Sequence, residues 1–293
     1  WNFAPDVISY NAAISACEKG GRWHGALALL CEMQDRDLEP SVISFSAAIS
    51  ACEKGERWQE ALGILCEMRH QQMPSNVVSY SAAISACEKC GRWQEALNML
   101  LEMRQRHLTP HVITYNAAIS ACEKGARWQK ALGLLCYMQQ QQSAPDVISY
   151  SATISACEQF GKWQEALGVF RELRQRQVAP NVITYSAAIS ACEKGERWLE
   201  AVGLLCEMRQ QQVFPNVLSY SAAISACEKN ERWQEALDML WQMQERQLAP
   251  NVISYNAVIS ACAKEERLQE VVRMLCATRQ WQLHQMFLAS LQV

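Results

Sequence analysis

The sequence has no apolar run that approaches the roughly eighteen residues needed to span a bilayer, although half of its 293 residues are hydrophobic. It contains only 12 glycines and 8 prolines, which excludes collagen-like and low-complexity chains. Neither sign of charge prevails, because 27 lysines and arginines stand against 30 acidic residues and give a net charge of −3. The chain is therefore not a generally basic nucleic-acid protein, and it is too apolar to be a disordered one.

Signals of catalysis and of bound groups are also missing. The five histidines do not recur at a fixed spacing and form no triad or metal-ligand pattern; they are His24, His70, His107, His111 and His284. No glycine-rich phosphate loop is present. We therefore expect a protein that is not an enzyme and has no cofactor, no metal, no small-molecule substrate and no membrane association.

The chain does contain a strong internal period of 35 residues. Seven of the eight prolines are spaced by 35 residues or a multiple of 35, namely Pro5, Pro40, Pro110, Pro145, Pro180, Pro215 and Pro250. A tryptophan recurs at the same interval from Trp23 to Trp233. A fixed period in this range is typical of a solenoid of stacked repeats.

We divide the chain into eight tandem units with no linker and no second domain. The units are 7–41, 42–76, 77–111, 112–146, 147–181, 182–216, 217–251 and 252–286. Residues 1–6 resemble the tail of an earlier unit, so we expect repeats upstream, and residues 287–293 form a C-terminal tail. The eighth unit has Leu268 in place of the tryptophan and lacks the proline, which is typical of a degenerate cap.

Each unit has the pattern of two helices. In the first unit, apolar residues from Val7 to Cys17 lie on one stripe at helical spacing, and those from Trp23 to Met33 form a second stripe. Gly20 stands where we expect a left-handed C-terminal cap, as do Gly55, Gly125 and Gly195. We predict an all-α fold, an α-solenoid of eight tandem helical hairpins in a superhelical repeat array.

The cysteines follow the same period. Eight recur in the first helix, at Cys17, Cys52, Cys87, Cys122, Cys157, Cys192, Cys227 and Cys262, and five in the second, at Cys31, Cys66, Cys136, Cys206 and Cys276. We interpret both sets as free thiols that pack on or beside the apolar stripes, in a reducing compartment. Cys87-x-x-Cys90 has no partner pair at ligand spacing, so we interpret it as structural.

Four further rows recur outside the expected core. An aliphatic residue stands at Ile8, Ile43, Val78, Ile113, Ile148, Ile183, Leu218 and Ile253. A small polar residue follows the aromatic at Asn11, Ser46, Ser81, Asn116, Ser151, Ser186, Ser221 and Asn256, and a polar residue ends each unit at Ser41, Asn76, His111, Asp146, Asn181, Asn216 and Asn251. A lysine recurs at Lys19, Lys54, Lys89, Lys124, Lys194, Lys229 and Lys264.

The 35-residue unit, its V-I-S/T-Y-N/S opening and the proline followed by Asn or Asp resemble the pentatricopeptide repeat family, P-type, over residues 7 to about 280. This resemblance implies binding of single-stranded RNA, one base per repeat. It assigns base selection to the two polar rows, sandwiching of bases to the aliphatic row, and phosphate contacts to the lysine row. It also implies RNA-processing proteins as further partners, and RNA processing, stabilisation or translation in the mitochondrion or chloroplast.

Carried over repeat by repeat, the resemblance predicts a target sequence. Asn11 with Ser41 favours a pyrimidine, and Asn116 with Asp146 favours uracil. Adenine is expected for Ser46 with Asn76, Ser151 with Asn181, Ser186 with Asn216 and Ser221 with Asn251. Ser81 with His111 is given no base, and Asn256 pairs with Met286, which selects weakly. The predicted target is 5′-YANUAAA-3′.

Other interpretations of these rows remain open. The same groove could serve a protein-binding helical scaffold without RNA recognition. Ser and Asn near helix starts could be N-caps, and the lysines, each beside a glutamate, could form a solvated helix face. The tryptophan row is interpreted as packing between helices, and the arginine row before it as part of the hairpin or as ion pairing.

Overall fold

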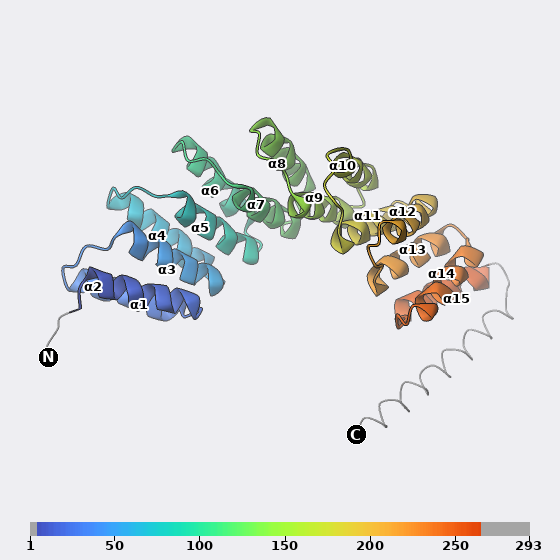
Figure 1. Cartoon of the computed structure of the whole chain (residues 1–293), viewed down its shortest axis with the longest axis horizontal. Helices are drawn as coiled ribbons and strands as arrows, with labels where there is room; N and C mark the ends of the chain where they lie inside the picture. Colours follow the sequence, from blue (N-terminus) through green and yellow to red (C-terminus); the bar gives the residue numbers. More distant parts are fainter. Residues whose placement is uncertain (1–4, 265–293) are drawn as a thin grey trace, which may run out of the picture. The chain divides into compact units, whose positions relative to one another are not determined.

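The chain, described here from a computed structural model, is α-helical throughout residues 5–264, which are the residues the structure describes (Figure 1). The first helices of the repeats are α1 (Val7–Lys19), α3 (Val42–Lys54), α5 (Val77–Lys89), α7 (Val112–Lys124), α9 (Val147–Gln159), α11 (Val182–Lys194), α13 (Val217–Lys229) and α15 (Val252–Lys264). The second helices are α2 (Trp23–Asp35), α4 (Trp58–His70), α6 (Trp93–Gln105), α8 (Trp128–Gln140), α10 (Trp163–Gln175), α12 (Trp198–Gln210) and α14 (Trp233–Glu245). The predicted all-α solenoid is confirmed, and the second helix expected in the eighth unit lies outside the described residues.

The chain divides into two compact units, one up to Ala156 and one from Cys157. The same packing rule holds inside each. The odd-numbered helices α1, α3, α5 and α7 pack against one another in order, as do α11, α13 and α15. Each of α2, α4, α6, α12 and α14 packs against the odd-numbered helices before and after it. Each unit is therefore a two-layered row of hairpins, with one odd layer and one even layer (Figure 1).

The odd layer is held together by small apolar residues. In α3, Ala48, Ile49 and Cys52 are fully buried, and the corresponding residues of the next repeats are buried in the same way. Alanine and cysteine at these positions let the helices approach closely, as ridges fit into grooves. The stripes predicted from the sequence are confirmed, since Tyr10, Ile14 and the stripe from Ala26 to Met33 form part of the core.

The even layer is joined by polar side chains instead. Arg69 of α4 donates to Glu102 of α6 at 2.7 Å, and Arg174 of α10 donates to Glu207 of α12 at 2.9 Å. Gln34 donates to Glu67 in the same register. The sequence analysis did not anticipate these contacts, although the recurrence of Arg or Gln 33 residues before Glu was the available signal.

The turn inside each hairpin differs from the prediction. Gly20, Gly55, Gly125 and Gly195 have φ between −80° and −87°, so they are not left-handed. The left-handed residue is the next one, for example Glu56 with φ 56°. Gly55 is required for another reason, because a Cβ there would lie 2.3 Å from Cδ1 of Trp23 in the preceding repeat.

The second set of cysteines consists of free thiols beside the apolar stripes, as predicted, but most of them do not pack into the core. Cys31, Cys136 and Cys206 are exposed and Cys66 is half-buried, because each lies on the solvent side of its even-numbered helix, one residue beyond a core position. The first set behaves as predicted from Cys52 onward. Burial raises the pKa of Cys52 to about 12, so this thiol stays protonated and apolar. Cys276 lies outside the described residues.

Candidate functional site

A row of exposed aliphatic side chains runs along the odd layer of each unit. It occupies the second position of every odd-numbered helix, and its members are between 54% and 75% exposed: Ile8, Ile43, Val78, Ile113, Ile148, Ile183, Leu218 and Ile253. Single exposed apolar residues are ordinary on protein surfaces. Their recurrence at one register position in every repeat is not, and it marks a surface suited to flat apolar partners.

The first predicted base-selecting residue of each repeat lies three residues further along the helix and faces the next odd-numbered helix. The Ser46 hydroxyl is 2.8 Å from the Ser79 hydroxyl, and the Ser81 hydroxyl is 2.7 Å from that of Thr114. Asn116 accepts a hydrogen bond from Ser149 in the same geometry. This row therefore links neighbouring repeats as well as bordering the aliphatic row.

The second predicted base-selecting residue caps the next odd-numbered helix. Asn76 accepts from the backbone N–H of Ser79 at 2.9 Å, and Asn181 accepts from that of Thr184 at 2.9 Å. Ser41, Asp146, Asn216 and Asn251 cap in the same way. The N-cap interpretation is thus confirmed for these residues, whereas His111 makes no side-chain cap bond.

The fold brings the two predicted residues of a repeat together although they are 30 positions apart. Asn11 Nδ2 donates to Ser41 Oγ at 3.3 Å, and Asn116 Nδ2 donates to Asp146 Oδ1 at 3.0 Å. The Ser221 hydroxyl donates to Asn251 Oδ1 at 3.4 Å. In these three repeats the pair is therefore one polar cluster on the same helix layer as the exposed aliphatic row.

Access to the two members of a pair differs. Asn116, Ser151, Ser186 and Ser221 are less than a tenth exposed, because they point between helices rather than outward. The second members are half-buried or, for His111 and Asn216, exposed. The Ser186 hydroxyl is buried and has no hydrogen-bond partner in the described chain. Asn256 is exposed, and its predicted partner Met286 lies outside the described residues.

The lysine row forms ion pairs between repeats. Lys89 pairs with Glu53 at 3.0 Å, Lys124 with Glu88 at 2.6 Å and Lys194 with Glu158 at 2.6 Å. Lys54, Lys229 and Lys264 pair in the same register, and Lys19 has no ion pair in the described residues. The lysines predicted to contact phosphate are thus held by carboxylates, each with part of its ammonium side chain still exposed.

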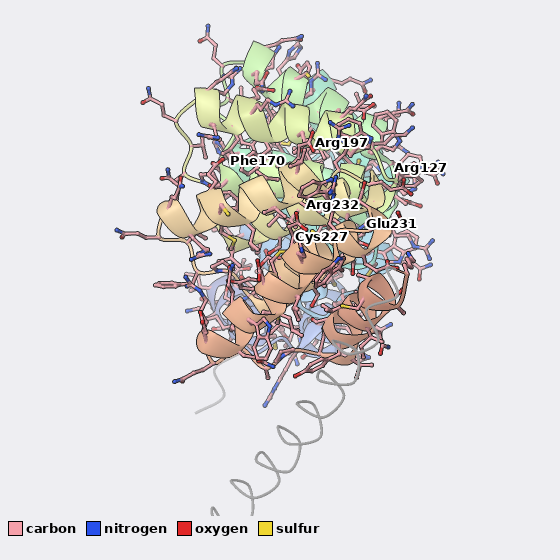
Figure 2. All side chains as sticks on the ribbon, turned by 90° about the vertical axis from the view of Figure 1, so that its right-hand side faces the viewer. Arg127, Phe170, Arg197, Cys227, Glu231 and Arg232 are labelled. Carbon is pink, nitrogen blue, oxygen red and sulfur yellow. The ribbon has the colours of Figure 1, made fainter. Side chains whose placement is uncertain are left out.

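The tryptophan and arginine rows meet at the turns between paired helices. The guanidinium of Arg57 lies 4.6 Å from the ring centroid of Trp23, and that of Arg92 lies 4.9 Å from that of Trp58. Arg197 and Arg232, labelled in Figure 2, stack on Trp163 and Trp198. The tryptophans also pack against the core, so the packing interpretation is confirmed and the arginines add cation–π contacts.

Within residues 5–264 no cluster of His, Cys, Asp and Glu could hold a metal ion. Cys87 of the Cys87-x-x-Cys90 pair is buried, and burial raises its pKa to about 12. None of the helices described there is long and apolar enough to cross a bilayer.

Sequence profiles of one repeat family match most of the chain. The profile described as the PPR repeat family matches residues 5–54, 75–124, 110–159 and 145–194. The pentatricopeptide repeat domain profile matches 203–265, and the PPR repeat profile matches 43–73, 183–213 and 253–279. A comparison with curated protein sequences gives no match.

Solved structures share the architecture. The pentatricopeptide repeat protein PPR10 from maize is 25% identical, with a TM-score of 0.70 over 92% of this chain and 39% of that chain. PPR10 in complex with an 18-nt psaJ RNA element gives a TM-score of 0.65, also at 25% identity, over 92% and 38%. The PPR domain of Arabidopsis thaliana protein-only RNase P 1, in complex with tRNA, is 16% identical and shares the fold, with a TM-score of 0.52 over 56% and 86%. The chain spans about two fifths of the length of PPR10.

Proposed function

Because the chain belongs to the pentatricopeptide repeat family, we propose that it binds single-stranded RNA and holds one base per repeat. The observation that carries the proposal is the exposed aliphatic row, which recurs in every repeat and lies beside polar pairs that are hydrogen-bonded in the first, fourth and seventh repeats. A base is flat and apolar on its faces and polar on its edges, so it fits between two aliphatic side chains with its edge toward the polar pair. The RNA-bound structure of PPR10 supports the proposal.

The caps suggest how the second residue of a pair selects its base. Asn216 caps through Oδ1, which leaves its amide N–H groups as donors for the N1 acceptor of adenine. Asp146 offers only acceptors, which suit the N3–H donor of uracil. On this basis we keep the target 5′-YANUAAA-3′, read parallel to the chain, and a role in organelle RNA processing, stabilisation or translation.

The decisive experiment exchanges the code of one repeat. Ser186→Asn together with Asn216→Asp should move the preference at that base from adenine to uracil, by roughly tenfold in relative affinity for one good polar contact. The reciprocal pair, Asn116→Ser with Asp146→Asn, should move its base from uracil to adenine. Mobility shifts with the two single-base variants of the target, and poly-C as a control, measure both. Unchanged base preferences would contradict the assigned code. If the protein shifts the mobility of none of these oligonucleotides, a protein-binding scaffold is favoured.

Phosphate contacts by the lysine row need a second measurement. If the seven lysines contact phosphates, six of them by giving up their glutamates, log affinity should fall with log salt at a slope of about −5 for a single strand. If the ion pairs persist in the complex, the slope should be much shallower. Lys124→Gln should reduce the slope by roughly 0.7 only in the first case.

A further inference from the structure

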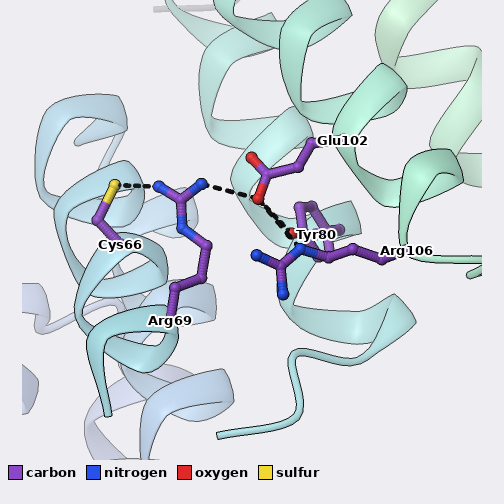
Figure 3. A network of polar contacts seen from close by, with 5 residues as sticks. All are labelled: Cys66, Arg69, Tyr80, Glu102 and Arg106. Carbon is purple, nitrogen blue, oxygen red and sulfur yellow. Dashed lines mark hydrogen bonds and ion pairs between the residues drawn. The ribbon is translucent and has the colours of Figure 1, made fainter. Parts of the chain in front are cut away.

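The even layer contains a recurring cradle for a carboxylate. In the third repeat, Glu102 accepts from the Tyr80 hydroxyl at 2.9 Å and from the Arg69 guanidinium at 2.7 Å, with Arg106 at 3.2 Å (Figure 3). Burial alone would raise the pKa of Glu102, but these hydrogen bonds outweigh it and leave the pKa below its ordinary value. The cradle therefore stabilises the charged carboxylate.

The sixth repeat has the same arrangement. Glu207 accepts from the Tyr185 hydroxyl at 3.0 Å and from the Arg174 guanidinium at 2.9 Å. Gln211 stands at the position that Arg106 has in the third repeat. Two donors, one tyrosine hydroxyl and one arginine from the preceding repeat, are thus common to both occupied cradles.

The fourth repeat keeps the donors and has lost the carboxylate. Arg104, Tyr115 and Gln141 stand at the positions of Arg174, Tyr185 and Gln211, but Tyr137 replaces Glu207. The guanidinium of Arg104 lies 4.0 Å from the ring centroid of Tyr137 and has no carboxylate partner in the described chain. The Tyr115 hydroxyl likewise has no hydrogen-bond partner there.

These donors line an open cavity of about 560 Å³. Arg104, Tyr115, Tyr137 and Gln141 lie on one side of it. The rest of the lining combines the apolar side chains of Leu101, Leu108 and Pro110 with the polar ones of Gln105, His107, Thr109 and Ser143. The two tyrosine rings lie with their centroids 6.2 Å apart, tilted by 47°. A group entering the cavity therefore meets a cation, a hydroxyl and an amide beside an apolar surface.

Volume alone does not single out this cavity, because one of the same volume lies between the first and second repeats. That cavity has Gln34 at the position of Arg104, and Asp37 and Glu39 line it. Its charge is the opposite of what a carboxylate requires. The fourth-repeat cavity is distinguished by an arginine whose internal acceptor has been lost. In the seventh repeat, where Gln242 replaces the glutamate, Arg209 still donates to Gln242 at 2.8 Å.

We propose that this cavity binds a carboxylate supplied from outside the chain, either a free small acid or an acidic side chain of a partner protein. Arg104 and Tyr115 hold it as Arg174 and Tyr185 hold Glu207, and the apolar wall accepts the adjoining hydrocarbon. The site is formed mainly by α6, α8 and the loops after them, so it does not depend on the RNA-binding proposal.

The full chain is titrated with glutarate and, separately, with a capped peptide that carries one Glu between leucines. Isothermal titration calorimetry measures the affinity and the stoichiometry. We expect one binding site in the wild-type chain. Arg104→Gln should lower its affinity at least tenfold because the cation is lost, and Tyr137→Glu should do the same because it places an internal carboxylate in the cradle. The matched variant is Glu207→Tyr, which should create a second site and raise the stoichiometry from one to two. Thermal unfolding checks that each variant is folded, and Tyr137→Glu should unfold at a higher temperature.

The outcomes separate the sources of the carboxylate. Binding of glutarate as tight as that of the peptide supports a small acid, and peptide binding at least tenfold tighter, lost in its Gln version, supports a partner protein. Equal binding by wild type and both weakened variants overturns the proposal. Tighter binding of inorganic phosphate, or displacement of glutarate by single-stranded RNA, also overturns it.

Discussion

The odd and even layers of the solenoid are built on different principles. Neighbouring odd-numbered helices meet through fully buried residues such as Ala83, Ile84 and Cys87. Neighbouring even-numbered helices are linked by partly exposed charged side chains such as Arg69 and Glu102. Contacts among odd-numbered helices are therefore mainly hydrophobic, whereas those among even-numbered helices include weaker, directional polar contacts.

This difference explains where the repeats tolerate variation. The run S-A-A-I-S-A-C-E-K recurs almost unchanged in the odd-numbered helices, because any change of volume would disturb two helix contacts at once. The glutamate position of the even-numbered helices is occupied by Glu102, Tyr137 or Gln242 in different repeats. A substitution in the even layer can thus create a new site while the packing of the odd layer is preserved.

The largest expected contrast between the layers is in thiol reactivity. Near pH 8, iodoacetamide should label Cys31, Cys136 and Cys206 on the even layer. It should leave Cys52 and Cys192, whose pKa values burial raises to about 12, unlabelled. Compared with a thiol at the ordinary pKa of 9.0, the thiolate fraction of these buried cysteines is lower by roughly a thousandfold. It rises only as the pH approaches 12. Mass spectrometry of native and urea-unfolded protein measures the difference, and equal native labelling would contradict it.

Two isoleucines on α7 sharpen the comparison within a single helix. Ile119 is fully buried in the odd layer and Ile113 is 73% exposed in the aliphatic row. Ile119→Ala should lower the free energy of unfolding by about 2–5 kcal/mol, whereas Ile113→Ala should change it by less than about 0.5 kcal/mol. Under the proposed function, only Ile113→Ala should weaken RNA binding without loss of stability. Urea unfolding and mobility shifts provide the two readings.

Two glycines test the contact between successive repeats. Gly55→Ala should destabilise the chain by about 1–3 kcal/mol, because the new Cβ would overlap the Trp23 side chain. Gly63→Ala, on α4, meets no atom within 4 Å and should stabilise by about 0.5–1 kcal/mol through helix propensity. Thermal unfolding of both variants gives the signs, and the same sign for both would refute this account of Gly55.

The smallest effect concerns the ion pairs of the even layer. Glu102→Gln should lower the free energy of unfolding by about 1 kcal/mol near neutral pH. The pKa of Glu102 is lowered in the folded state from its ordinary value of 4.5. Its contribution is therefore complete above that value and disappears as the pH falls through the lowered pKa. Urea midpoints measured against pH should converge for variant and wild type at low pH, and midpoints that stay apart there would contradict this account.

The sequence predicted the parts of the fold that depend on periodicity. The stripes through Tyr10 and Ile14 identified the helices and their buried faces, since 3.6-residue spacing is a property of the sequence itself. Gly55 was assigned the wrong role because both a left-handed φ and a close neighbour select for glycine, and only the structure places Trp23 against it.

For the candidate site, the sequence predicted which residues pair but not how deeply they are buried or which ion pairs they form. The pairing of Asn116 with Asp146 followed from the resemblance, and the structure brings the two side chains together. The burial of Ser186 and the ion pair of Lys124 with Glu88 could not be predicted, because they depend on the angle at which one repeat meets the next. Sequence spacing alone does not determine that angle.

The stacking of Arg57 on Trp23 always joins one repeat to the next one at the same sequence separation, and it recurs from Trp58 to Arg92 and from Trp93 to Arg127. Loss or duplication of a whole 35-residue unit would therefore leave each of these tryptophans with an arginine, or with a lysine where the next unit is the one that contains Lys162, on the far side of the new junction. The gene for such an array can lengthen or shorten by unequal recombination without compensating mutations, provided that each exchange adds or removes whole 35-residue units.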